Sequence, residues 1–283
     1  MAFPLRFGLK LNQQIHPIDL QRQSWRAADA AGFDHLWLFD HLFALGGDPT
    51  KPILDGWTTL AAAAENTRRA RLGLNVTGNL YRHPGLLAKI AVTIDHLSGG
   101  RLEFGLGAAW NEPEFVQQGL PFPSAGDRIR MLDESVKVIK LLWTEERATF
   151  AGRFYNLNEA IAEPKPVQKP WPPIWIGGSG PKRTLRVVAK HADVWHGGGN
   201  SDEETKDLLR ILGEHCAKAG RDMSSIRLAG SLRIEDEETA LRQVESRRRM
   251  GYSDFLVFPA QGVDLLAGIE RAVKLLPRLR ELA

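Results

Sequence analysis

The chain has 283 residues, of which 43 % are hydrophobic and 25 % are charged. This composition is that of an ordinary globular protein, and the length fits either one large α/β barrel or two smaller domains. The net charge of +3 is too small to indicate binding to nucleic acid or to an anionic membrane.

A single cysteine, Cys216, excludes an intramolecular disulfide and a thiolate metal cage. No apolar run approaches the roughly 18 residues of a membrane-spanning helix. The first ten residues lack the pattern of a secretory signal. We therefore expect a cytoplasmic protein.

Short apolar runs alternate with longer amphipathic ones along the chain. The runs with strand character are Leu5–Leu11, His35–Asp40, Arg71–Thr77, Leu102–Ala108, Pro173–Gly177, Asp193–Gly197, Ile226–Ile234 and Asp254–Pro259. The helical patterns are Pro17–Ala31, Trp57–Asn66, Gly85–Leu97, Arg128–Trp143, Pro181–His191, Asp202–Ala219, Glu235–Gly251 and Val263–Leu282. Eight strands each followed by a helix, at about 35 residues per unit, predict an α/β fold, a (β/α)8 TIM barrel, in one domain over residues 1–283.

Two irregular segments interrupt this alternation, one after the fourth strand and one before the fifth. The second, Glu145–Pro172, holds four prolines within nine residues, from Pro164 to Pro172. It is either a linker between domains or a proline-stiffened excursion between barrel units.

The segment after the fifth strand is a candidate phosphate site, because barrel enzymes place their sites at the C-terminal ends of the strands. There Gly177–Gly180 lead into a helix expected to begin at Pro181, with Lys182 and Arg183 in its first turn. Free N–H groups at a helix start favour an anion. The segment is thus either a phosphate-binding loop or a tight turn beside solvated basic residues.

Two other groups of glycines indicate ligand binding less strongly. Gly197–Gly199 form either a second backbone surface for a phosphorylated ligand or a flexible loop. Gly105 and Gly107 are spaced as in a dinucleotide-binding motif, but Trp110 occupies the place of its third small residue. A nicotinamide-binding Rossmann unit is therefore not expected.

Asp40 and His41, at the end of the second strand, are the best acid–base candidates, since histidine exchanges a proton near neutral pH. The alternative is a structural histidine at the barrel rim. The histidines form no His-x-His or HExxH pattern, so we expect no metal. Arg247–Arg249 are interpreted as a solvated helix face, and Tyr81–Pro84 as an ordinary loop with some chance of function.

Together these segments resemble the luciferase-like monooxygenase superfamily, and within it the oxidoreductases that depend on coenzyme F420. The matching stretches are Phe39–His41, Asn75–Pro84, the helix Leu86–Leu97, Ser98–Asn111 and Pro173–Gly180. The resemblance covers roughly residues 5–200 well and the remainder loosely.

The resemblance implies a barrel, commonly a homodimer, that holds F420 or FMN at its mouth. It implies a non-proline cis peptide bond at Asn75–Val76 behind the cofactor ring, and His41, oriented by Asp40, as proton donor or acceptor. The cofactor-binding residues expected from the strand ends and from this resemblance are Asp40, Asn75, Val76, Thr77, Gly107, Ala108, Trp110, Asn111, Gly177, Gly178, Ser179, Gly197 and Gly198.

The resemblance alone does not identify the substrate. Relatives that oxidise a sugar phosphate carry a tryptophan shortly after the histidine and a glutamate in the loop after the fourth strand. Here Leu42–Leu45 follow His41, and Trp110 stands near the place of the glutamate, which argues against a sugar phosphate. The nearby aromatic residues favour a hydrophobic or aromatic substrate: Phe43, Trp57, Trp110 and Phe115.

The sequence thus predicts hydride transfer between F420 and a small organic molecule. One alternative is an FMN-dependent monooxygenase that uses supplied reduced flavin under a lid formed by Asn111–Gly126 or by the proline-rich segment. A second alternative is a non-catalytic barrel that binds a cofactor.

Overall fold

The computed structural model describes residues 3–11, 13–259 and 264–282. The barrel strands form one parallel sheet in the order β3-β2-β1-β11-β10-β9-β8-β5-β4, and a further pairing of β3 with β5 closes the sheet into a barrel. The strands are β1 Arg6–Lys10, β2 His35–Leu38, β3 Arg71–Leu74, β4 Thr77–Gly78, β5 Leu102–Gly107, β8 Ile174–Gly177, β9 Val194–His196, β10 Arg227–Arg233 and β11 Tyr252–Phe258. The predicted TIM barrel is confirmed.

The third predicted strand is divided into β3 and β4 by a bulge at Asn75 and Val76. The peptide bond between these two residues is cis, as the resemblance implied. The strand resumes at Thr77, which pairs with Leu106 of β5.

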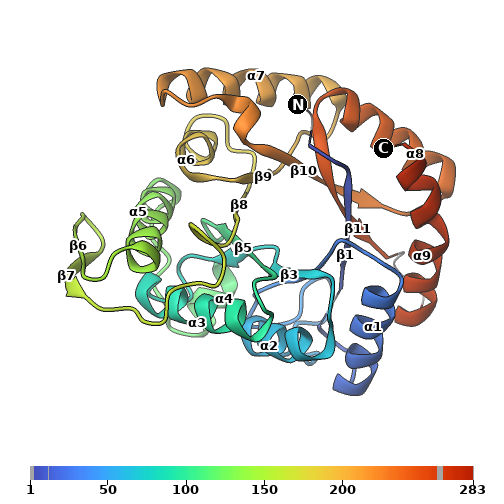
Figure 1. The fold of residues 1–283 in the computed structure, drawn as a ribbon, viewed down its shortest axis with the longest axis horizontal. Coiled ribbons are helices and arrows are strands. Elements are labelled where there is room, and N and C mark those ends of the chain that lie inside the picture. The colour runs from blue at the N-terminus through green and yellow to red at the C-terminus, as the bar shows by residue number, and fades with distance from the viewer. Residues whose placement is uncertain (1–2, 12, 260–263, 283) are drawn as a thin grey trace.

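Eight helices follow the barrel strands and surround them (Figure 1). They are α1 Ile18–Ala30, α2 Gly56–Asn66, α3 Pro84–Leu97, α5 Ala125–Thr144, α6 Thr184–His191, α7 Asp202–Lys218, α8 Glu237–Arg249 and α9 Leu265–Glu281. Several begin at a side chain that accepts a hydrogen bond from the first turn, namely Asp55, Ser124, Ser201, Asp236 and Asp264. Val263, the first residue of the last predicted helix, lies outside the described residues.

The barrel buries apolar side chains on both faces of its sheet, as a parallel sheet covered by helices must. Inside the barrel, Trp37 and Trp175 pack edge to face with ring centroids 4.5 Å apart, beside Val194 and Leu256. A Cβ at Gly73 would come within 2.3 Å of the Trp37 ring, so β3 carries glycine where the indole crosses it.

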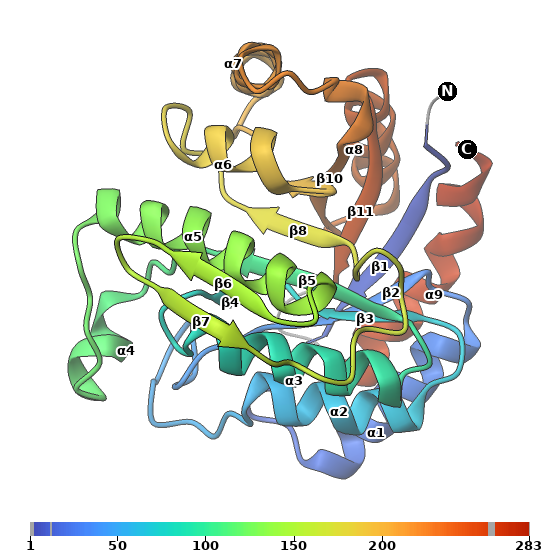
Figure 2. The ribbon, with the colours of Figure 1, turned by 60° about the vertical axis from the view of Figure 1, so that its left-hand side comes forward.

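Both predicted insertions are present. Helix α4, Glu112–Gln117, follows β5, and a hairpin of β6, Ala148–Ala151, and β7, Asn156–Ala160, precedes β8. Figure 2 shows this hairpin outside the barrel, beside α5. Glu134 of α5 accepts hydrogen bonds from the N–H groups of residues 153, 154 and 155 at the hairpin turn. The proline-rich segment is therefore an excursion that returns to the same sheet.

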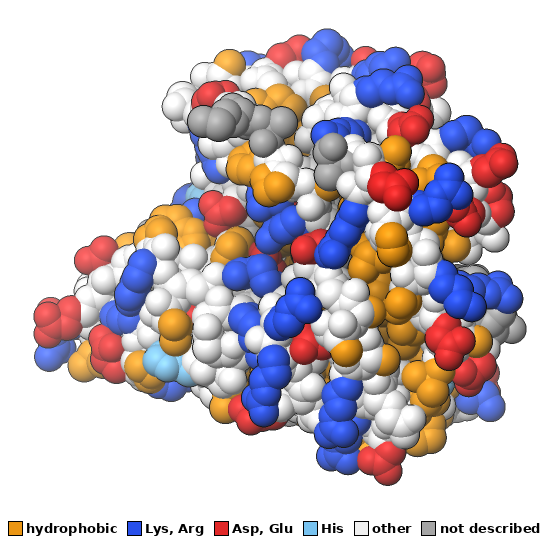
Figure 3. Space-filling model, turned by 45° about the vertical axis from the view of Figure 1, so that its right-hand side comes forward, with side chains coloured by type: hydrophobic (Ala, Val, Ile, Leu, Met, Phe, Trp, Pro, Cys, Tyr) orange, Lys and Arg blue, Asp and Glu red, His pale blue; other side chains and the backbone are white. Residues whose placement is uncertain are grey.

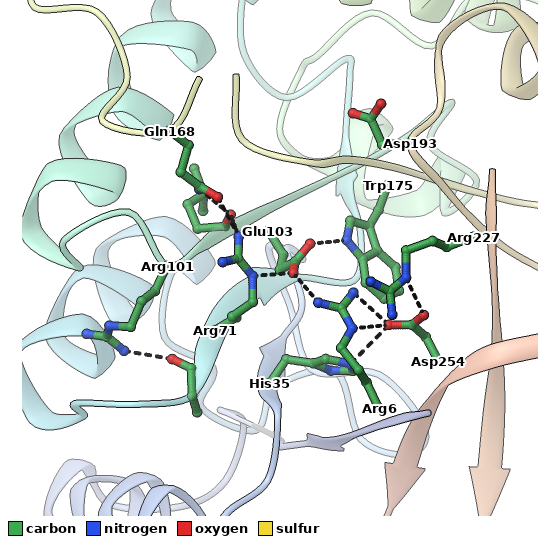
Figure 4. Close-up of polar contacts among 12 residues, drawn as sticks. Arg6, His35, Arg71, Arg101, Glu103, Gln168, Trp175, Asp193, Arg227 and Asp254 are labelled. Carbon is green, nitrogen blue, oxygen red and sulfur yellow. Dashed lines mark hydrogen bonds and ion pairs between the residues drawn. The ribbon is translucent and has the colours of Figure 1, made fainter. Parts of the chain in front are cut away.

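A charged network closes the N-terminal end of the barrel, opposite the strand ends that concern function (Figure 4). Arg6 contacts Glu103 at 3.1 Å and Asp254 at 2.7 Å, and Arg227 contacts Asp254 at 2.9 Å. Arg71 also pairs with Glu103. Burial alone would raise the pKa values of both fully buried carboxyl groups. The charges of Arg6 and Arg71 instead hold the pKa of Glu103 below its ordinary range, and the contact with His35 and the charge of Arg6 do the same for Asp254.

The outer surface carries mixed charge. On the face drawn in Figure 3, basic and acidic side chains are interspersed, which fits the small net charge. Cys216 is buried. Within the described residues, no helix combines the length and the apolar character needed to cross a bilayer.

Candidate active site

A cavity of about 450 Å³ lies at the C-terminal ends of the barrel strands. Most of the predicted site residues line it, namely Asp40, His41, Asn75, Val76, Gly107, Ala108, Trp110, Gly177, Gly178 and Ser179. Its size is that of a site for a small molecule or cofactor. We refer to it as the main cavity.

Four predicted site residues do not line the main cavity. Thr77 is fully buried and donates a hydrogen bond to Asp40, and Asn111 is buried and donates to Glu114 at 2.9 Å. Gly197 and Gly198 line a neighbouring hollow instead. Thr77 and Asn111 therefore lie outside the cavity wall and hold Asp40 and Glu114 in position through hydrogen bonds.

The bulge after β3 determines the wall of the main cavity. A Cβ at Gly107 would lie 2.8 Å from Cγ2 of Val76, and one at Gly177 would lie 3.0 Å from its Cγ1. Val76 thus occupies the space that side chains on β5 and β8 would need. These two glycines are required by packing against Val76, and they leave a smooth wall beside it.

The carboxylate that holds His41 is Glu114, not Asp40 as predicted. Glu114 is fully buried on α4, and its Oε1 lies 2.8 Å from Nδ1 of His41. Tyr81 donates a hydrogen bond to the other carboxylate oxygen. Burial would raise the pKa of Glu114, but the hydrogen bonds from His41 and Tyr81 outweigh it and lower the pKa. The ionised carboxylate can only accept, so the proton of His41 is on Nδ1 and Nε2 is left as the basic atom.

Asp40 takes part in a different set of contacts. Arg82 binds Asp40 at 2.6 Å and Asp55 at 2.8 Å. Burial raises the pKa of Asp40 despite this cation and the bond from Thr77. The prediction that Asp40 orients His41 is wrong because Arg82 and Thr77 occupy its carboxylate.

The loop after β8 has the donors expected of a phosphate site. Among the described residues, no protein group accepts a hydrogen bond from the N–H of Ser179 or of Gly180. Both residues line the main cavity, as does Thr184 at the start of α6. These donors are therefore available to an anion in the cavity.

The helix start was predicted three residues too early. Residues 181–183 form a turn, and α6 begins at Thr184. Lys182 and Arg183 are exposed, and the Arg183 guanidinium lies over Gly126, where it would meet an added Cβ at 2.6 Å. The basic side chain that does line the main cavity is Arg128 of α5.

Arg128 is held in place while part of its guanidinium remains unpaired. Its Nη1 donates to the carbonyl oxygen of Pro123 at 2.7 Å, and its Cζ lies 3.9 Å from the centre of the Phe122 ring. Its Nε is buried and has no hydrogen-bond partner among the described residues. Because Arg128 lines the main cavity and its guanidinium bonds only to an uncharged carbonyl among the described residues, its charge is available to an anionic ligand there.

The predicted second backbone surface is not formed by Gly197–Gly199. The N–H of Gly197 donates to Ala229, that of Gly198 to Ser179 Oγ at 3.1 Å, and that of Gly199 to Thr205 Oγ1 at 3.0 Å. These donors are used within the protein. The prediction of an anion-binding backbone is therefore wrong for this loop.

Lys10 lies behind the wall of the main cavity, and His196 lines it. Nζ of Lys10 donates to the carbonyl oxygens of Leu38 at 2.8 Å and Asn75 at 2.5 Å, and burial lowers its pKa to about 7. Burial and the charge of Lys10 lower the pKa of His196 to about 4. His196 is therefore neutral at pH 7 and contacts Asn75 and Ser231, each at 3.2 Å.

The aromatic residues expected around the substrate are largely elsewhere. Trp110 lines the main cavity and is 67 % exposed. Trp57 is buried and donates to Thr77 at 3.2 Å, while Phe115 is buried against Tyr81, 4.8 Å between ring centres. The apolar character of the cavity therefore comes from Trp110, Val76 and Ile129.

Five residues of the site were missed or interpreted as ordinary in the sequence. Lys10, Tyr81, Arg82, Glu114 and Arg128 contact the predicted residues or line the cavity. Two signals were visible: a lysine within the apolar first strand, and the place of Tyr81 and Arg82 in a stretch that resembles the family. Within the described residues, no group of three or more His, Cys, Asp or Glu side chains is placed to hold a metal.

The site thus combines a cavity at the strand ends of a barrel, a loop with unpaired N–H donors and a histidine paired with a buried glutamate. The model of the luciferase-like monooxygenase family matches residues 1–264. This chain therefore belongs to the luciferase-like monooxygenase family, as predicted, and is an enzyme of it.

Individual relatives agree with this assignment. An F420-dependent glucose-6-phosphate dehydrogenase of Microbacterium testaceum is 33 % identical over 255 residues, covering 86 % of this chain and 73 % of the relative. An uncharacterized protein of Mycobacterium tuberculosis is 37 % identical over 169 residues, 60 % of this chain, and the match spans 58 % of that protein's length.

A solved F420-dependent secondary alcohol dehydrogenase, in complex with an F420-acetone adduct, has a TM-score of 0.86 at 20 % identity. The match covers 98 % of this chain and 99 % of that one. At this level of identity the likeness establishes the shared fold.

Proposed function

We propose that this protein is an F420-dependent oxidoreductase that transfers a hydride between the deazaflavin and a small organic substrate. The observation that carries the proposal is one cavity that joins the His41–Glu114 pair to the unpartnered donors of Ser179, Gly180 and Arg128. The names of the F420-dependent relatives support the choice of cofactor.

The residues present fit this cofactor. The N–H groups of Ser179 and Gly180 and the guanidinium of Arg128 would hold its phosphate. The smooth wall formed by Val76, Gly107 and Gly177 would support its ring system. When bound, F420 supplies a two-electron hydride carrier.

In this mechanism His41 handles the proton that accompanies oxidation or reduction of the substrate. Its Nε2 would accept the proton of a substrate alcohol in one direction, or deliver it to a carbonyl oxygen in the other. Glu114 holds the ring through Nδ1 and stabilises its charged form. Trp110, Val76 and Ile129 would contact an apolar part of the substrate.

Titration of the purified protein with F420 and with FMN tests the cofactor. We expect tight binding of F420 and weak binding of FMN. Tighter binding of FMN would contradict the proposal and favour a flavin-dependent monooxygenase.

Turnover tests the role of His41. With a panel of alcohols and carbonyl compounds, the absorbance of the cofactor reports hydride transfer. The His41→Ala variant should lose turnover by about 10²–10⁴-fold and keep its affinity for F420. Unchanged turnover would refute the role of His41, and wild-type protein that binds F420 but transforms no member of the panel would favour a non-catalytic binding barrel.

A further inference from the structure

A second hollow of about 240 Å³ adjoins the main cavity. It is lined by Ser179, His196, Gly197, Gly198, Gly199, Gly230, Ser231 and Arg247, and we refer to it as the Arg247 chamber. Ser179 and His196 line both hollows. The two hollows therefore share the part of their wall that these two residues form.

Glycines keep this chamber open. A Cβ at Gly198 would lie 3.3 Å from Nη1 of Arg247, and one at Gly230 would lie 3.3 Å from the Tyr252 ring. The N–H groups of Gly197–Gly199 are bonded within the protein. The polar groups that remain for a ligand are therefore side chains and the N–H of Ser179, which also lines the main cavity.

The guanidinium of Arg247 is the main polar group of the chamber. It donates to Thr205 Oγ1 and to the carbonyl oxygen of Gly199 at 3.1 Å, and its Cζ lies 5.5 Å from the centre of the Tyr252 ring. These partners are all uncharged. Arg247 is half-buried, although the sequence indicated a solvated helix face.

The charge of Arg247 is not balanced inside the chamber. Among the described residues, no ion pair includes Arg247, and no carboxylate lines the chamber. Arg247 and Ser231 also line a further hollow of about 440 Å³, whose lining includes Asp202 and Arg242. His196 is neutral at pH 7. Of the described residues that line the chamber, Arg247 is therefore the one that carries a charge at pH 7.

An arginine has five N–H donors in a planar fork, and two of those of Arg247 have protein acceptors. The remaining donors suit a carboxylate or a phosphate, which a guanidinium binds more strongly than a neutral acceptor. Ser231, on the same wall, adds a hydroxyl group.

We propose that the Arg247 chamber binds a carboxylate or phosphate group of a molecule whose reacting part occupies the main cavity. This inference rests on the proposed function for the identity of that molecule. The anionic group belongs either to an acidic substrate or to the glutamyl tail of the cofactor, and the two sources are distinguished by the experiment.

The main variant is Arg247→Gln, with Arg248→Gln as its matched control, because Arg248 is an exposed neighbour on α8 that does not line the chamber. Ser231→Asp is a second variant, which retains Arg247 and places a carboxylate beside it. Ser231 is exposed, so this change should not prevent folding.

Two binding measurements separate the sources. If the cofactor tail occupies the chamber, Arg247→Gln and Ser231→Asp should weaken binding of F420 by about 10–100-fold and leave binding of its tail-free form, which keeps the phosphate, unchanged. If an acidic substrate occupies it, the variants should raise KM by the same factor for acidic members of the substrate panel and not for their uncharged analogues. If neither changes, or if Arg248→Gln has the same effect, the proposal is wrong.

A third measurement does not depend on the proposed function. In an Arg128→Met background, which removes the cation of the other anion site, inorganic phosphate should raise the thermal midpoint of the protein. The rise should be lost on adding Arg247→Gln and kept on adding Arg248→Gln. Failure of F420 to bind would reject the proposed function alone, whereas equal phosphate stabilisation with and without Arg247 would reject the chamber.

Discussion

The Glu114→Gln substitution tests most directly how the site operates. Glutamine has nearly the same shape, so it can still accept from Nδ1 of His41 and can donate to Tyr81, but it removes the negative charge. In the structure this charge accepts bonds from His41 at 2.8 Å, from Asn111 at 2.9 Å and from Tyr81. The substitution therefore keeps the packing and weakens support for the charged imidazole.

The expected magnitude follows from the kind of bond that is lost. A hydrogen bond to a charged group contributes about 1.5–3 kcal/mol, compared with about 0.5–1.5 kcal/mol for a neutral one. Because glutamine keeps a neutral hydrogen bond to His41, the loss is the difference between the two, about 1–1.5 kcal/mol. We therefore expect kcat to fall by about 5–13-fold at 1.36 kcal/mol per factor of ten. The affinity for cofactor should not change, because Glu114 does not line the main cavity.

The assay is single-turnover hydride transfer, followed by the absorbance of the cofactor, with the best substrate of the panel. Because Glu114 acts through His41, the substitution should have no further effect in a His41→Ala background. Equal slowing in both backgrounds would refute the reasoning, as would a kcat within twofold of the wild type. The thermal midpoint of each variant separates loss of fold from loss of rate.

Three further predictions concern packing, electrostatics and cofactor binding. Gly105→Ala should destabilise the fold by at least about 1–3 kcal/mol, because its Cβ would lie 2.0 Å from a backbone oxygen. Gly213→Ala on α7 should stabilise it by about 0.5–1 kcal/mol, because its Cβ would lie 3.5 Å from the nearest atom, a sulfur. Urea unfolding measures the free energy of unfolding of both variants. Asp254→Asn should cost about 3–5 kcal/mol at pH 7. Because the native pKa of this carboxyl group is lowered, the loss should stay constant above about pH 5 and shrink as the pH falls below about 4; a loss that grows on acidification would contradict the ion-pair account. Arg128→Met should weaken binding of F420 by about 10–100-fold but not of the deazaflavin nucleoside without phosphate; equal loss for both would place the phosphate elsewhere.

Much of the fold could be predicted from the sequence because barrel strands and helices have local signatures. Runs such as Leu102–Ala108 are apolar apart from Glu103, since both faces of the strand are buried, and β5 occupies Leu102–Gly107. The start of α6 was misplaced because Pro181 suits a first helical turn, yet residues 181–183 form a separate turn. The hairpin at β6 and β7 was missed because its strands are short and half-exposed.

In the candidate site, too, some residues could be predicted from the sequence and others could not. Asp40, His41, Asn75 and the loop at Gly177 stand at strand ends, and the barrel rule brings strand ends together whatever lies between them. The partner of His41 could not be inferred, because Glu114 is 73 residues away along the chain on a short helix of an insertion. The position of that helix decides whether Asp40 or Glu114 binds His41.

The sequence by itself determined the barrel, the family and the strand ends that face one another, because these follow from periodicity and from segments contiguous in the chain. Only the tertiary structure decided what each group does there. It assigned Glu114 to His41 and Arg82 to Asp40, and it directed Arg128 and Arg247 inward while Lys182 and Arg183 remain at the surface. The physical reason is that hydrogen bonds and ion pairs act over a few ångströms, and those separations are fixed by packing between elements distant in the chain.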